Sequence, residues 1–100
     1  MSYRLTKAAQ QDIREITRYI RNVQKSPQNA KLIVTRLKAA FANLVTQPNL
    51  GHARAELDDD AARVIVVSGV LVIYDPALKP LTVLRVVHTS RDLGQISARE

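Results

Sequence analysis

The sequence predicts an α+β domain in which a short N-terminal strand and an antiparallel helical hairpin precede an antiparallel sheet, in the order βααβββ. Two long segments repeat apolar residues at helical spacing, and three later segments are rich in Val, Leu and Ile. A stretch without periodicity separates the two sets. The chain has 100 residues, of which 46% are hydrophobic, which fits one packed domain over residues 1–100.

The first helix is expected after a short strand at residues 2–5. Thr6 is a suitable N-cap, so the helix should begin at Lys7. Apolar residues then recur every three or four positions and form one buried stripe: Ala9, Ile13, Ile16, Ile20 and Val23. A second stripe is basic and consists of Arg14, Arg18, Arg21 and Lys25. It could bind phosphates or an acidic chain, although an ordinary solvated helix face has the same composition.

The second helix is expected to begin at Pro27 with Ser26 as its N-cap, because the first helical position does not use the N–H that proline lacks. Its broad apolar face runs from Ala30 to Val45, and Pro48 should end it. The short link between the two helices predicts an antiparallel hairpin. Residues 49–62 have no apolar rhythm and predict a long connecting loop.

Three strands are expected after the loop. Residues 63–67 and 70–74 flank Ser68-Gly69, which predicts a hairpin with a two-residue turn. Residues 81–88 make the third strand. These strands are apolar on both faces, so we expect helices on one face and a bound partner on the other. The polar tail at residues 91–100 should fray unless something holds it.

Composition excludes several classes of protein. The chain has no cysteine, which excludes disulfides and thiolate zinc sites. No signal peptide and no membrane-spanning run is recognisable, which predicts a cytoplasmic protein. Fifteen Lys and Arg against nine Asp and Glu give a net charge of +6. This surplus favours nucleic acid, an acidic protein segment or an anionic membrane surface, and it is also compatible with a plainly solvated surface.

Sites for metals and cofactors are poorly supported. His52 and His88 lie far apart, and the three glycines do not form a phosphate-binding loop. We therefore expect neither a metal nor a cofactor.

Cationic chemistry is the remaining candidate. RNA cleavage by its own 2′-hydroxyl needs a base, an acid and cations, and suitable side chains are His88, Glu56, Arg63 and Arg85. Strand alternation, however, should place Arg85 and His88 on opposite faces. A structural or partner-contacting role for the arginines is therefore the favoured interpretation.

Three segments resemble the RelE/ParE superfamily of bacterial toxins from type II toxin–antitoxin pairs. The similarity extends from Leu5 to Leu93, and it rests on the order and spacing of the segments together. They are Leu5-Thr6-Lys7-Ala8-Ala9-Gln10-Gln11-Asp12-Ile13 with Ile16 and Tyr19-Ile20; Leu44 through Pro48 and Gly51 with Arg54-Ala55-Glu56-Leu57; and Tyr74 with Leu84-Arg85-Val86-Val87-His88-Thr89-Ser90-Arg91-Asp92. The last block resembles the ParE branch, whose final strand runs into a His, two small residues and Arg-Asp.

This resemblance implies a toxin that inhibits DNA gyrase by binding rather than catalysis. It also implies a hetero-oligomer with a ParD-like antitoxin, whose acidic, partly helical C-terminal segment wraps over the hairpin and sheet. The candidate residues for binding the antitoxin or the target are Arg14, Arg18, Arg54, Arg63, Arg85 and Arg91.

Two alternatives stay open. One is a RelE-like ribosome-dependent mRNA endonuclease that would use Arg63, Arg85 and His88; the lack of a tyrosine after Tyr74 favours ParE instead. The other is a binding module that only partners an antitoxin and co-represses their operon.

Overall fold

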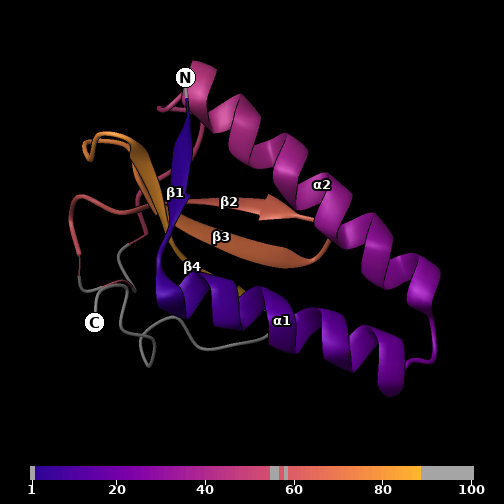
Figure 1. The fold of residues 1–100 in the computed structure, drawn as a ribbon. Helices are drawn as coiled ribbons and strands as arrows, with labels where there is room; N and C mark the ends of the chain where they lie inside the picture. The colour runs from indigo at the N-terminus through magenta and orange to yellow at the C-terminus, as the bar shows by residue number, and fades with distance from the viewer. Residues whose placement is uncertain (1, 55–56, 58, 89–100) are drawn as a thin grey trace.

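The computed structural model describes residues 2–54, 57 and 59–88, and its elements follow the predicted order (Figure 1). The predicted polar tail at residues 91–100 lies outside the described residues. The elements are β1 (Tyr3–Leu5), α1 (Lys7–Asn22), α2 (Pro27–Thr46), β2 (Arg63–Val67), β3 (Val70–Asp75) and β4 (Leu81–His88). The α+β class and the order βααβββ are confirmed.

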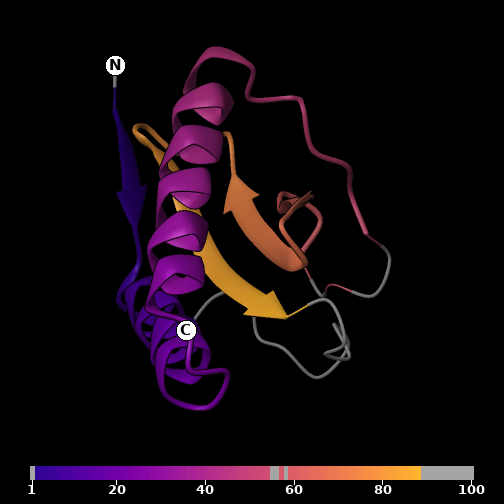
Figure 2. The same cartoon turned by 90° about the vertical axis from the view of Figure 1, so that its right-hand side faces the viewer.

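The strands form one sheet in the order β1-β4-β3-β2, and both helices cover the same face of it (Figure 2). Strands β2, β3 and β4 are antiparallel, as predicted. Ser68 and Gly69 form the β2–β3 turn with φ of 52° and 79°, and two positive φ values match the twist of a hairpin. β1 joins by parallel pairing with β4, from Tyr3–Leu81 to Leu5–Val83. This pairing starts α1 beside the last strand.

The predicted caps bound both helices. The Thr6 hydroxyl accepts a hydrogen bond from the Ala9 N–H at 3.0 Å and donates one to the Leu84 carbonyl at 2.7 Å. Ser26 caps α2 in the same way, by accepting from the Asn29 N–H. α1 ends at Asn22, and Lys25 has a φ of 52°. Lys25, which we expected on the basic stripe, therefore lies beyond the helix.

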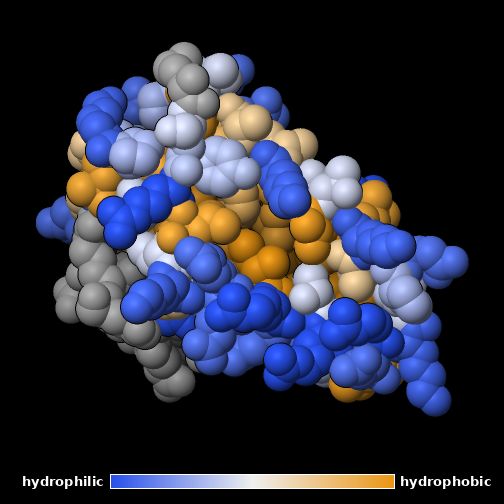
Figure 3. Space-filling view, viewed as in Figure 1, coloured by the Kyte–Doolittle hydropathy of each residue, from blue (hydrophilic) through white to orange (hydrophobic). Residues whose placement is uncertain are grey.

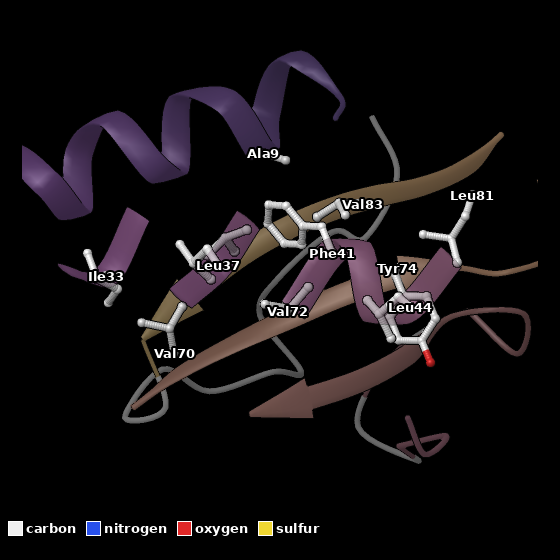
Figure 4. Close-up of a cluster of buried hydrophobic side chains, with 11 residues drawn as sticks. Ala9, Ile33, Leu37, Phe41, Leu44, Val70, Val72, Tyr74, Leu81 and Val83 are labelled. Atoms are coloured by element: carbon white, nitrogen blue, oxygen red, sulfur yellow. The ribbon is translucent and has the colours of Figure 1, made fainter. Parts of the chain in front are cut away.

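The main core lies between the helices and the sheet (Figure 4). α2 contributes one side chain at each turn, and alternate residues of β3 face them across the interface, as a period of two requires. The buried members of this cluster are Ala9, Ile33, Leu37, Phe41, Leu44, Val70, Val72, Tyr74, Leu81, Val83 and Val86.

The opposite face of the sheet carries a second buried cluster. Its strand residues include Leu71, Ile73 and Val87, and Leu57 and Ala62 join them from the loop that connects α2 to β2. Figure 2 shows this connection on the side of the sheet away from the helices. The expectation that a bound partner covers this face is therefore wrong: the chain buries it with its own loop.

A β-bulge interrupts β4. β3 pairs Ile73 with Arg85 and Tyr74 with Val83, so Leu84 is an extra residue in β4. Val83 and Val86, three positions apart, consequently both enter the helix-side core. The alternation is therefore broken between Val83 and Arg85, so these two residues do not share a face as strict alternation would require. From Arg85 to His88 the register with β3 is continuous, and the alternation that should place these two residues on opposite faces is kept.

Asp12 ties α1 to the part of β4 that β1 does not reach. Its carboxylate accepts hydrogen bonds from Arg85 Nε at 2.7 Å and from Arg85 Nη2 at 3.0 Å, one on each oxygen. One oxygen also accepts the backbone N–H of Val86 at 3.0 Å. The Asp12 carboxylate thus accepts hydrogen bonds both from the backbone N–H of Val86 at the strand edge and from the Arg85 guanidinium. Both side chains are largely buried, Asp12 with 10% and Arg85 with 15% exposed.

Gly51 anchors the start of the connecting loop. Its N–H donates to the Tyr74 hydroxyl at 2.8 Å, and this hydroxyl donates to the Pro48 carbonyl at 2.8 Å. The Gly51 carbonyl accepts from Arg63 Nη1. A Cβ at position 51 would lie 2.7 Å from the Tyr74 hydroxyl, so only glycine lets the chain pass this closely.

We expect Asp12→Ala to lower the free energy of unfolding by about 3 kcal/mol, because it removes the carboxylate that a largely buried guanidinium and a strand-edge N–H both bind. Urea denaturation measures the change. The matched control is Glu15→Ala, which removes an exposed carboxylate from the same helix and should change stability by less than about 0.5 kcal/mol. Equal effects of the two substitutions would contradict the structural role of Asp12.

Tyr74→Phe should destabilise the protein by about 1–3 kcal/mol, because the Gly51 N–H and the Pro48 carbonyl lose their partner at a buried position. Tyr19→Phe is the control, since Tyr19 is 55% exposed and should leave the midpoint of thermal unfolding unchanged. A Tyr74→Phe protein as stable as the control would show that the hydroxyl does not hold the loop.

Candidate functional site

The structure divides the six candidate arginines into different environments. Arg14 and Arg18 are exposed on α1, and Arg54 is exposed in the connecting loop. Arg63 and Arg85 are partly buried in β2 and β4. Arg91, like the proposed acid or base Glu56, lies outside the described residues.

The two strand arginines hold the fold together. Arg85 spans both oxygens of Asp12, and Arg63 donates to the Gly51 carbonyl at the start of the loop. A guanidinium that is fixed by a bidentate ion pair is not available to grip a phosphate in the same way. The contacts therefore support the structural role that we favoured for these arginines.

The proposed nuclease set does not converge. Arg63 lies opposite Tyr74 of β3, whereas His88 lies opposite Val70. Four residues of strand separate these positions, which is about 13 Å. His88 approaches α1 instead and lines a hollow together with Asp12. Within residues 2–54, 57 and 59–88, no three His, Cys, Asp or Glu side chains are grouped to hold a metal ion.

An apolar hollow of about 220 Å³ opens between β1, α1 and α2, and we call it the β1 hollow. Its deepest residues are Leu37 and Phe41. The Tyr3 ring packs on Phe41 with 5.3 Å between the ring centroids. The partly buried apolar side chains that complete the lining are Leu5, Ile13 and Val34.

Cations border the β1 hollow. Arg14 of α1 and Lys38 of α2 line it and are exposed, as is the polar Gln10. Figure 3 shows hydrophobic atoms exposed between the two helices, with hydrophilic side chains around them. Among the residues that the structure describes, no carboxylate lines this hollow. An apolar floor with a cationic border suits a partner segment that is apolar on one side and acidic beside it.

A larger hollow of about 540 Å³ lies on the other flank of α1, beside the end of β4. It is lined by two carboxylates, Asp12 and Glu15, together with Tyr19, His88 and several apolar side chains. The charge of Asp12 is compensated by Arg85, but the exposed carboxylate of Glu15 would repel an acidic segment. The smaller β1 hollow is therefore the better candidate for binding an acidic partner.

Tyr3, Leu5 and Lys38 are site residues that the sequence pattern alone does not predict. A signal was present, since Tyr3 and Leu5 point to one side of a strand and Val34 and Phe41 are seven residues apart on one helix face. What the sequence could not show is that β1 pairs with β4 and so brings these two sets together.

None of the helices in the described part of the chain is long and apolar enough to cross a membrane.

Comparison with curated proteins finds no match. Residues 3–93, however, match the family described as the ParE toxin of type II toxin–antitoxin systems, parDE. The match spans every helix and strand of the structure, and the chain belongs to the family of ParE toxins of type II toxin–antitoxin systems.

Proposed function

We propose that this toxin inhibits DNA gyrase by binding it, and that a ParD-like antitoxin neutralises it by placing its acidic C-terminal segment over the β1 hollow. The observation that carries the antitoxin part is the hollow itself: an apolar floor next to exposed Arg14 and Lys38. Membership of the ParE family supports the gyrase part. The site of action would be the bacterial cytoplasm, where gyrase works.

The two components of the hollow would contribute differently to antitoxin binding. Apolar side chains that enter between the helices would supply most of the affinity, at about 25 cal/mol for each Å² removed from water. Arg14 and Lys38 would speed association and set the register by pairing with carboxylates. The net charge of +6 adds a long-range attraction for an acidic chain.

The geometry also favours binding over catalysis. Arg63 and Arg85 form structural contacts, and His88 lies at the other end of β3 from Arg63. A protein that acts by binding needs complementary surfaces and not a converging set of proton donors and cations.

Purified toxin should inhibit supercoiling of relaxed plasmid by gyrase, and its expression without the antitoxin should induce the DNA-damage response. Both readouts follow from trapping or blocking the enzyme on DNA. Unaltered supercoiling at toxin concentrations well above that of gyrase would contradict the proposal. So would new cuts at codon boundaries in cellular mRNA, which primer extension would detect and which would identify an endonuclease.

Val34→Ser should weaken antitoxin binding about five- to tenfold, because it removes apolar surface from the β1 hollow. Isothermal titration calorimetry with the cognate antitoxin measures this affinity. The control is Val66→Ser, which makes the same change at a residue that is 58% exposed on β2 and does not line the hollow.

The cations that border the β1 hollow should affect the kinetics of antitoxin binding rather than mainly its affinity. Arg14→Gln with Lys38→Gln should lower the association rate and make it less dependent on salt, with a smaller change in the dissociation rate. If Val66→Ser weakens binding as much as Val34→Ser, or if the charge variant behaves as the wild type at every salt concentration, the antitoxin binds elsewhere.

A further inference from the structure

α1 carries its cations and its carboxylates on different flanks. The cations are Lys7, Arg14, Arg18 and Arg21, and all four are exposed. At 100° of rotation per residue they fall within a sector of about 60° on the helix circumference. We call this set the α1 basic stripe. It differs from the sequence-based stripe by the loss of Lys25, which lies beyond the helix with a φ of 52°.

The carboxylates of α1 do not neutralise the α1 basic stripe. Asp12 and Glu15 both line the hollow beside β4. Asp12 is bound to Arg85, and Glu15 accepts a hydrogen bond from Gln11. Among the residues that the structure describes, no member of the stripe forms an ion pair. Four positive charges therefore face solvent along one side of a helix.

The spacing of the stripe matches a phosphate backbone. With a rise of 1.5 Å per residue, Arg14, Arg18 and Arg21 cover about 10 Å, and the stripe with Lys7 covers about 21 Å. A DNA strand places one phosphate in each 3.4 Å of helix axis, or about 1.7 Å when both strands are counted. Each turn of the stripe, about 5.4 Å, therefore spans about one to two phosphates of one strand, or about three when both strands are counted.

The chemistry of the stripe also separates it from the β1 hollow. Its neighbours on the helix surface are polar, namely Gln10, Gln11 and Asn22. A protein interface needs an apolar core beneath its polar border. Arg14 borders such a core in the β1 hollow, but Lys7, Arg18 and Arg21 do not line that hollow. Phosphate contacts need only cations and hydrogen-bond donors. Because three of the four cations lie outside the apolar hollow, the stripe as a whole favours nucleic acid over an acidic protein segment.

We propose that the α1 basic stripe binds the phosphate backbone of double-stranded DNA without reading its sequence. The β1 hollow, which only Arg14 of the stripe lines, stays available to a protein partner. This binding mode does not depend on the gyrase proposal, because it would hold the toxin on DNA whatever its target. Its strength should be governed by salt, since each phosphate contact releases condensed counterions.

The test is fluorescence anisotropy of a labelled random-sequence DNA duplex titrated with the full chain at several salt concentrations. Four contacts predict a slope of about −3.6 for log K against log salt, at about −0.9 per phosphate. Arg18→Gln with Arg21→Gln should bring the slope to about −1.8 and weaken binding at low salt by roughly tenfold or more. Circular dichroism confirms that the variant retains its helices.

The matched control removes two exposed charges that are not on α1, by Lys31→Gln with Lys79→Gln, and it should keep the slope of the wild type. The stripe proposal is overturned if wild-type protein fails to bind the duplex at low salt, or if the control loses as much affinity as the stripe variant. It is also overturned if the stripe variant binds DNA normally but loses affinity for polyglutamate or for the antitoxin. That last result would identify the stripe as a protein interface and would leave the gyrase proposal untouched.

Discussion

The buried carboxylate of Asp12 is the constraint on which the arrangement of this toxin depends. β1 pairs with β4 only from Leu81 to Val83, and a sheet edge beyond that point would leave backbone groups without partners. Asp12 accepts the N–H of Val86 at this edge and holds Arg85 with both oxygens. Thr6 binds the carbonyls of Val83 and Leu84 from the start of the same helix. Hydrogen bonds from Thr6 and Asp12 to β4 therefore fix the position of α1 along this strand at two points.

The position of α1 on β4 determines where the acidic, basic and apolar sides of this helix lie. With Asp12 turned toward β4, Glu15 faces the same hollow and the four basic residues of α1 are directed to solvent. The apolar side of α1 then meets α2 and β1, where Ile13 and Val34 line the β1 hollow. One buried ion pair consequently separates an acidic flank, a basic flank and an apolar hollow on a domain of 100 residues.

Local features of the fold were predictable because local forces determine them. Thr6 and Ser26 cap their helices since their side chains reach the N–H three residues on. Ser68-Gly69 forms the hairpin turn because both residues adopt positive φ. Lys25 was placed on the helix stripe by periodicity alone, and the turn between the helices overrode that pattern.

The candidate site was predictable only in part. Exposed Arg14 and Arg18 were recognisable from the repeat of charge along α1. The sequence does not predict the contacts of Arg63 and Arg85, because nothing in the local sequence tells which acceptor an arginine will meet. Their acceptors are the Gly51 carbonyl, 12 residues away, and Asp12, 73 residues away. The β1 hollow was not predicted because it combines β1 with both helices.

By itself, the sequence determined the class of the domain, the order of its helices and strands, the first residue of each helix, its basic charge and its resemblance to ParE toxins. Each of these depends on neighbouring residues, on composition or on the order of segments. Only the tertiary structure decided that β1 joins β4 in parallel, that Leu84 forms a bulge and that the loop covers the far face of the sheet. These features arise from burial and from the satisfaction of polar groups between distant segments, which no local pattern specifies.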